Sequence, residues 1–227
     1  MSLLKLRYKK TSVELEPPST LTCPAKNYEI PKGLKGPQLS IARLYANYGD
    51  IINKYCRHYK IETPAALAVI NVEAGGVGAY DGASQLAVIR VEARPPLLSQ
   101  VRFPDGEAEF KHKYGRGQNA EWKALAEWFA MEGERACYWT SFGLGQIMGF
   151  NYALVNCSNP VEVMLRAQSS SAESAKMFFD FVDSKKIIPA LQAKEWFDFA
   201  QVYNGTRNAK VYARKIADCY DLAVSIL

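Results

Sequence analysis

The feature that most limits how this chain can fold is a mostly apolar, uncharged run at residues 68–72 that ends in the carboxylate Glu73. Such a run predicts a helix buried on most of its sides, and Gly75 and Gly76 predict its end. A carboxylate held against a buried helix loses hydration, so its pKa should rise. A carboxylic acid still protonated near neutral pH can donate a proton to a leaving group. On its own, Glu73 is better explained as an exposed glutamate at a helix end, so further motifs must decide.

Helical periodicity surrounds this run. From Leu39, apolar residues recur at three- and four-residue spacings as far as Tyr59, which predicts an amphipathic helix. Thr63 and Pro64 supply an expected N-cap and first-turn proline for the helix that ends at Glu73. Later helices are predicted at residues 121–131, from 160 onward after the Asn159 cap, from the capping box of Ser170 and Glu173 to 184, at 194–203 and at 209–226.

Two stretches depart from this pattern. Residues 77–118 contain clustered prolines and glycines, and within them residues 86–92 predict a short strand. Residues 1–38 contain five prolines and are predicted to be an irregular N-terminal arm. We therefore predict an α+β fold that is mainly α. Its single domain, residues 39–227, should combine a helical lobe with a small β or loop insert after Glu73.

Composition excludes several classes of protein. The net charge of +5 favours anionic partners, but no block of five Lys or Arg residues occurs, so we expect no nucleic-acid partner. The five cysteines are odd in number and include no CxxC pair, which argues against a disulfide framework and a zinc site and predicts buried thiols. With only two histidines available, we expect no metal and no cofactor.

A proton donor that acts on a sugar needs a second group to stabilise or intercept the resulting cation. The candidates are Asp81, Glu92 and Asp105. Asp81 and Asp105 each precede a glycine and are typical of turns. Glu92 ends the predicted strand and could point across a cleft, and Arg90 two residues earlier is a candidate for substrate binding. An ion pair of Glu92 with Arg90 or Arg94 is an equally good interpretation.

Two further motifs follow in order along the chain. Residues 143–151 read Gly-Leu-Gly-Gln-Ile-Met-Gly-Phe-Asn, a turn that exposes backbone and carries one amide, Gln146. An amide can hold an acetamido or hydroxyl group through both a donor and an acceptor. Tyr203, Asn204 and Gly205 end a predicted helix. Each motif alone is also an ordinary glycine loop or C-cap, but their joint occurrence after Glu73 is more specific.

With these motifs, the chain resembles the phage-type N-acetylmuramidase family, found in endolysins, within the lysozyme superfamily. The matching stretches cover about residues 39–225 and are residues 41–45 with 48–49, residues 68–76, 89–92 and 143–151, Trp196 with residues 199–200, and residues 203–205. The resemblance implies a lysozyme-like fold, cleavage between N-acetylmuramic acid and N-acetylglucosamine, and Glu73 as the catalytic acid. It also implies that Gln146, Tyr203 and Asn204 line the cleft, as in goose-type lysozymes and lytic transglycosylases.

The chain departs from this family at two positions. Ala74 stands where a serine often follows the glutamate, and Val91 stands where phenylalanine usually precedes the second glutamate. Neither change removes a carboxylate. Among the four tryptophans, core packing is the expected role of each, but Trp139, just before the glycine turn, is the best candidate to stack on a sugar.

The resemblance implies peptidoglycan glycan strands as the partner, and we expect a monomer. The N-terminal residues 1–7 lack the features of a secretory signal peptide, and no apolar run approaches the ~18 residues that span a bilayer. We therefore expect synthesis in the bacterial cytoplasm and action on the wall after release or delivery.

Three alternatives remain open at this stage. A lytic transglycosylase would use a single acid/base glutamate and release 1,6-anhydro products. A non-catalytic wall-binding protein could keep the same fold. A toxin delivered by a secretion system would share the chemistry of a phage lysin.

Overall fold

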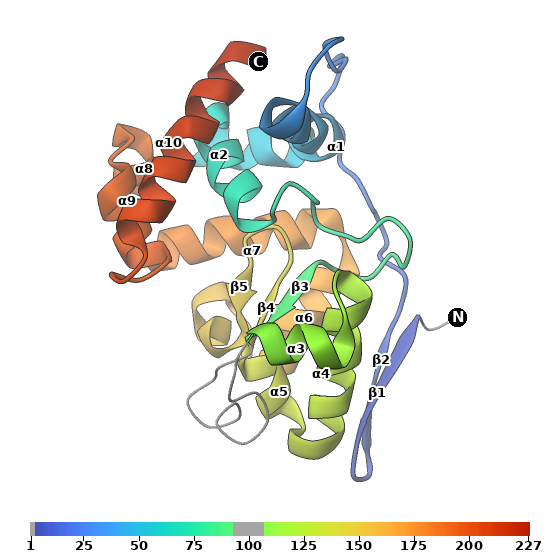
Figure 1. The fold of residues 1–227 in the computed structure, drawn as a ribbon. Coiled ribbons are helices and arrows are strands. Elements are labelled where there is room, and N and C mark those ends of the chain that lie inside the picture. The colour runs from blue at the N-terminus through green and yellow to red at the C-terminus, as the bar shows by residue number, and fades with distance from the viewer. Residues whose placement is uncertain (1–2, 93–106) are drawn as a thin grey trace.

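A computed structural model describes residues 3–92 and 107–227 of the chain. The protein has two lobes, and the long helix α7 (Ser171–Ser184) runs between them (Figure 1). The helical lobe consists of α1 (Gly36–Tyr59), α2 (Thr63–Glu73), α8 (Ile188–Ala193), α9 (Trp196–Tyr203) and α10 (Ala209–Ile226).

The second lobe is built around a small antiparallel sheet of order β3-β4-β5. Its strands are β3 (Ile89–Val91), β4 (Thr140–Phe142) and β5 (Ile147–Met148). Around them lie α3 (Glu107–Tyr114), α4 (Gln118–Glu132), α5 (Glu134–Tyr138), the 3-10 helix η1 (Gly149–Val155) and α6 (Pro160–Ser169). The prediction of a mainly helical α+β fold is confirmed. None of the described helices combines the length and the apolar character needed to cross a membrane.

The helix that carries Glu73 forms as the sequence predicts. Every residue of α2 from Ala65 to Asn71 is buried, because α1 and α10 both pack on it. The expected cap is wrong by one residue. Glu62 occupies the N-cap position, and the Thr63 hydroxyl instead donates to Asn53 Oδ1 at 2.7 Å.

The predicted caps of α6 and α7 are present. Asn159 Oδ1 accepts the backbone N–H of Glu162 at 3.0 Å, and Ser170 Oγ accepts that of Glu173 at 3.1 Å. The Glu173 carboxylate does not complete a reciprocal box, since it pairs with Arg166 at 2.7 Å. Side-chain capping therefore fixes where both helices begin.

The prediction of an irregular N-terminal arm is wrong at its start. The hairpin strands β1 (Leu4–Tyr8) and β2 (Thr11–Leu15) pair antiparallel, and β1 lies against α4. Leu6 and Leu15 are fully buried there. The alternation of apolar and polar residues in β1 was a strand signal. The hairpin was not recognised because its turn contains no glycine or asparagine. Lys9 takes the positive φ of 51° there instead.

The strand predicted at residues 86–92 is shorter than expected, and residues 89–91 alone form β3. Side chains from helices take the place of a further neighbouring strand. The backbone N–H of Ile89 donates to Gln118 Oε1 at 2.8 Å, and that of Val91 donates to Glu121 Oε2 at 2.7 Å. The helix α4 therefore covers an edge that would otherwise be open.

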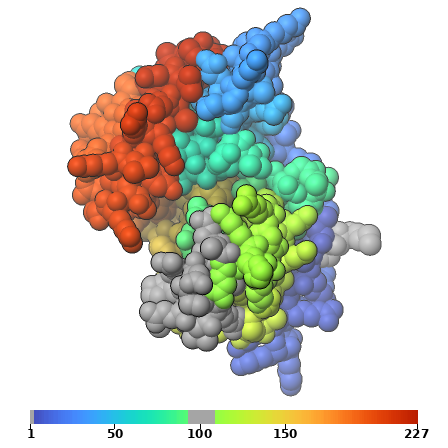
Figure 2. All heavy atoms as spheres, viewed as in Figure 1, coloured from blue at the N-terminus to red at the C-terminus, as the bar shows by residue number. Residues whose placement is uncertain are grey.

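The two lobes share a continuous core. In the space-filling view the C-terminal helices lie at the upper left and the α3–α4 region lies lower on the right (Figure 2). All five cysteines are free thiols. Cys56, Cys137 and Cys157 are buried as predicted, whereas Cys23 and Cys219 are half-buried. Burial raises the pKa of the Cys56 thiol to about 12, which keeps it protonated and unreactive.

Candidate active site

A cleft of about 540 Å³ lies between the lobes. One side, the helical wall, is formed by residues of α2, α9 and α10 and of the loop between the last two. The other side, the sheet wall, is formed by residues of the β3-β4-β5 sheet, its turn and η1. The helical wall contributes Glu73, Tyr203, Asn204, Asn208 and Tyr212, and the sheet wall contributes Arg90, Glu92, Ser141, Gln146, Phe150 and Asn151.

Glu73 is the last residue of α2, and the chain turns away directly after it. Gly75 and Gly76 both take positive φ values, of 58° and 73°. A Cβ atom on Gly76 would lie 2.1 Å from Ser40 Oγ, so no larger residue fits there without a shift. This turn directs the following chain away, and Glu73 lines the cleft.

The environment of Glu73 favours its protonated form. Burial raises the pKa of its carboxyl to about 7, although the hydrogen bond from Asn204 and the nearby charges of Lys215 and Arg90 oppose this. Asn204 Nδ2 donates to Glu73 Oε1 at 2.8 Å. Because the loss of hydration outweighs these attractions, the group is partly protonated near neutral pH. The pKa rise expected from the sequence is present.

Glu92 lines the same cleft, at the end of β3. Its backbone N–H donates to the carbonyl of Trp139 at 3.0 Å, which extends the pairing of β3 with the chain before β4. Burial raises the pKa of the Glu92 carboxyl, and the charge of Arg90 opposes the rise. The cleft therefore brings together the two carboxylates and the arginine that the sequence singled out.

Neither of the other two candidates for the second carboxylate is among the described residues that line the cleft. The Asp81 carboxylate accepts the backbone N–H of Ser84 at 2.9 Å and its hydroxyl at 2.8 Å, so it stabilises a turn and does not line the cleft. Asp105 lies outside the described residues.

Gln146 lies in the cleft wall at positive φ, in the turn between β4 and β5. Its Nε2 donates to the carbonyls of Val88 at 3.1 Å and Gly143 at 2.8 Å. Its Oε1 accepts the Ser141 hydroxyl at 2.9 Å. Both amide protons are thus committed to the protein, and only acceptor capacity on Oε1 remains for a ligand.

Tyr203 connects the two walls, and Asn204 connects α9 to Glu73 within the helical wall. Tyr203 Oη donates to the carbonyl of Gly145 at 2.7 Å, which fixes the glycine turn against α9. Asn204 Oδ1 is buried and has no hydrogen-bond partner among the described residues. The amide nitrogen of Asn204 already donates to Glu73. Its Oδ1 is therefore an acceptor to which a substrate hydroxyl or amide can donate.

Trp139 lies beside the cleft and is not part of its lining. Its ring centroid is 5.9 Å from that of Phe150, which does line the cleft. Trp122 and Trp128 are buried in the core, as expected. Direct stacking of Trp139 on a sugar stays a prediction.

Residues 62–223 of the chain match the family model described as Muramidase, N-acetylmuramidase. The chain belongs to this N-acetylmuramidase family. Among solved structures, the muramidase is similar to the Burkholderia AP3 phage endolysin, with 27% sequence identity, a TM-score of 0.59, and coverage of 78% of this chain and 70% of that one. No curated protein matches it.

Membership of the family makes the protein a glycoside hydrolase that acts on peptidoglycan, as the sequence predicted. The similarity to a phage endolysin agrees with the phage-type branch that the motifs indicated.

Besides Ser141, which donates to the Gln146 side chain, three polar residues of this muramidase cleft were not predicted from the sequence: Lys185, Asn208 and Tyr212. Tyr212 lies close enough to Glu73 for the charge of that carboxylate to add to the burial that raises the pKa of the Tyr212 phenol. None of the three belongs to a motif, and each has a residue type common on helix surfaces. Only the packing of α7 and α10 brings them to the cleft. No group of His, Cys, Asp or Glu side chains suited to hold a metal ion is present among residues 3–92 and 107–227.

Proposed function

We propose that the protein cleaves the glycosidic bond between N-acetylmuramic acid and N-acetylglucosamine, with Glu73 as the general acid. The observation that supports this most strongly is the partly buried Glu73 carboxyl in the cleft wall, whose pKa is raised to about 7. Such a group keeps its proton in a large fraction of molecules at neutral pH, and its pKa is close to the operating pH, where general acids are most effective.

Hydrogen bonding gives the two oxygens of Glu73 different roles. Oε1 accepts a hydrogen bond from Asn204, so the proton resides on Oε2. In the proposed reaction Oε2 gives this proton to the glycosidic oxygen as the bond to the anomeric carbon breaks, and the sugar ring becomes cationic. Glu92, directly or through a water that it orients, then stabilises or intercepts that cation.

The remaining predicted residues have positioning roles in this scheme. Asn204 orients Glu73 and offers Oδ1 to the substrate, while Tyr203 holds the glycine turn in place. Arg90 lies near both carboxylates and lowers the pKa of each. Gln146 can accept one hydrogen bond from a sugar hydroxyl or acetamido group while its amide protons hold the turn.

A lytic transglycosylase is the second candidate, and one observation favours it. The raised pKa of Glu92 works against the ionised form that a stabilising or nucleophilic carboxylate requires. A transglycosylase needs Glu73 alone, since the substrate's own 6-hydroxyl closes an anhydro ring.

One digest separates these candidates. Purified peptidoglycan is treated with the wild type and with Glu73→Gln, and the products are reduced and identified by mass spectrometry. We expect reducible N-acetylmuramic acid ends from the wild type only. Anhydro ends, one water lighter, would assign the protein to the transglycosylases. No cleavage by the wild type would leave a protein that binds wall, and the proposed mechanism would be wrong.

We also propose where and in what form the protein acts. The partner is the peptidoglycan glycan strand, the working form is a monomer, and the protein reaches the wall from the cytoplasm by release or delivery.

A further inference from the structure

The surface beside the cleft contains a second hollow, which we call the distal groove. It has a volume of about 380 Å³ and is lined by Glu134, Arg135, Tyr138, Tyr152, Ser158 and Asn159, with Pro160 at its edge. No motif in the sequence pointed to it, and the proposed reaction does not use it.

The distal groove and the catalytic cleft lie on two sides of η1. Phe150 and Asn151 of η1 line the cleft, while Tyr152 lines the distal groove. In a 3-10 helix each residue is turned by a third of a circle from the last, so neighbouring side chains point to different sides. One short helix therefore forms a wall of both hollows.

Aromatic rings cover the ridge between the hollows. The ring centroid of Tyr138, in the distal groove, is 5.7 Å from that of Phe150, in the cleft. Trp139 lies 5.1 Å from Tyr138 and completes the cluster. Tyr138 and Phe150 are each 37% exposed. Large aromatic side chains exposed together on a surface mark an interaction site, and this one connects the two hollows.

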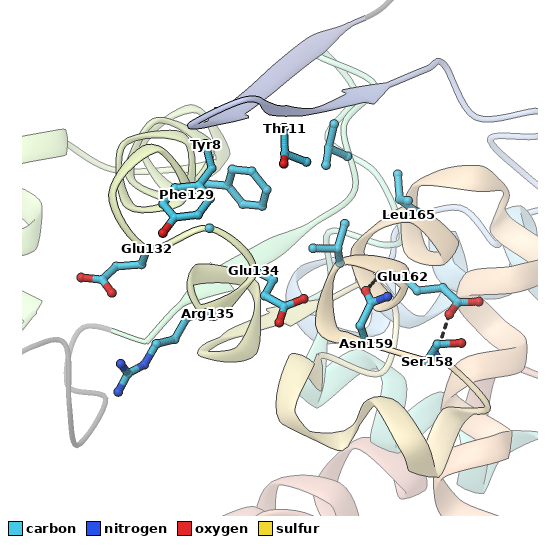
Figure 3. Close-up of a pocket in the computed structure, with 13 residues that line it drawn as sticks. Tyr8, Thr11, Phe129, Glu132, Glu134, Arg135, Ser158, Asn159, Glu162 and Leu165 are labelled. Carbon is cyan, nitrogen blue, oxygen red and sulfur yellow. Dashed lines mark hydrogen bonds between the residues drawn. The ribbon is translucent and has the colours of Figure 1, made fainter.

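Polar groups in the distal groove complement the rings. Among the described residues, neither the Glu134 carboxylate nor the Arg135 guanidinium has a hydrogen bond or ion pair. Asn159 uses only Oδ1 for capping, which leaves its Nδ2 as a donor. The close-up of the adjoining hollow shows Glu134 directed toward Asn159 (Figure 3).

These features favour one class of ligand. A sugar presents apolar C–H faces to aromatic rings and hydroxyl or acetamido groups to polar side chains, so rings combined with both donors and acceptors suit it. Opposite charges on Glu134 and Arg135 give no preference for a polyanion. The hollow drawn in Figure 3, about 770 Å³, shares four residues with the distal groove and extends it toward the β1-β2 hairpin.

We infer that the distal groove binds the continuation of the glycan strand whose bond is cleaved beside Glu73, and that the enzyme prefers strands long enough to fill both hollows. This inference rests on the proposed function. The aromatic cluster of Tyr138, Trp139 and Phe150 carries the strand over the ridge, which gives Trp139 a place in binding outside the cleft itself.

The test compares kcat/KM on long and short substrates. The long substrate is purified glycan strand freed of its peptides, and the short one is a tetrasaccharide of the same alternating amino sugars. We expect Tyr152→Ala to lower kcat/KM on the long substrate about tenfold and to leave the tetrasaccharide rate unchanged. Tyr138→Ala, at a more exposed position, should act the same way if Tyr152→Ala fails to fold. Phe197→Ala removes another exposed ring and should change neither rate.

Each outcome decides a different point. Equal wild-type kcat/KM on both substrates, or equal losses on both in the folded variants, would overturn the distal groove and leave the muramidase assignment intact. No cleavage of either substrate by the wild type would instead overturn the proposed function. In that case titration of Glu73→Gln with both substrates in a calorimeter still tests the groove, since tighter binding of the long strand must weaken in Tyr152→Ala.

Discussion

The two walls of the cleft hold their carboxylates in different ways. On the helical wall, Glu73 is fixed by a buried helix and by a side-chain hydrogen bond from Asn204. On the sheet wall, Glu92 is positioned through its backbone at Trp139, and no described side chain donates a hydrogen bond to its carboxylate. Burial raises the pKa of both groups, but Glu73 alone is also held in a defined orientation. The comparison indicates that the fold orients the carboxyl of Glu73 more closely than that of Glu92.

The largest effect should come from Glu73→Gln. Gln keeps the shape and can still accept the hydrogen bond from Asn204, but it has no proton to give. We expect wall-clearing activity to fall by about 10² to 10⁴-fold, measured as the loss of turbidity of outer-membrane-stripped cells.

The same variant should also change stability with pH, which is a control for folding. The pKa of Glu73 rises from 4.5 to about 7 in the folded protein. Below pH ~4.5 the group is protonated in both states, so its ionisation does not change the free energy of unfolding. As the pH rises toward 7, ionisation in the unfolded state lowers that free energy progressively. Glu73→Gln removes this loss of stability. The variant should therefore match the wild type at pH 4.5 and exceed it at pH 8 by about 1 to 3 kcal/mol in free energy of unfolding. A variant less stable than the wild type at pH 8 would contradict the burial of Glu73.

The next largest effect tests the sheet wall. If Glu92 stabilises the sugar cation, Glu92→Gln should lower kcat by about 10²-fold with little change in KM. If the enzyme is a transglycosylase, the loss should be several-fold at most and the products should carry anhydro ends. Asp81→Asn, outside the cleft, is the matched control. An equal loss in Asp81→Asn would show that the effect of Glu92→Gln is structural.

Gln146 tests whether the sheet wall acts mainly as a scaffold. Gln146→Leu removes the two side-chain hydrogen bonds to the Val88 and Gly143 carbonyls, and we expect a loss of about 2 kcal/mol in free energy of unfolding by denaturant titration. Gln146→Glu should be no better, because a carboxylate cannot donate to a carbonyl. Unchanged stability combined with a raised KM would instead make Gln146 a substrate ligand and little else.

The smallest expected effect is a shift in pH dependence. A general acid must be protonated, so kcat should be constant at acidic pH and fall as the pH rises through about 7. The hydrogen bond from Asn204 lowers the pKa of Glu73, so Asn204→Leu should move this limb to higher pH. A pH–rate profile from pH 5 to 9 measures the shift. A limb that stays in place, or moves to lower pH, would show that Asn204 does not set the pKa of Glu73.

Most helices could be predicted from the sequence because caps, prolines and apolar periodicity depend only on residues that are close in the chain. The cap at Asn159, the proline at Pro160 and the apolar residues 68–72 act over one or two turns, and α6 and α2 form accordingly. The β1-β2 hairpin was missed because its turn at Lys9 carries no turn residue. The strand at residues 86–92 was predicted too long, because the side chains of Gln168 and Trp122 take both backbone hydrogen bonds of Ala87.

By itself, the sequence determined that Glu73 ends a buried helix and that a glycine turn and a Tyr-Asn pair follow it in order. These facts depend on residues close in the chain, and the family match agrees with them. The tertiary structure decided the rest. In the folded protein the amide protons of Gln146 bind backbone carbonyls. Trp139 lies outside the cleft lining, whereas Lys185, Asn208 and Tyr212 belong to it. Such contacts join segments far apart in the chain, and they arise only when the two lobes pack around a common core.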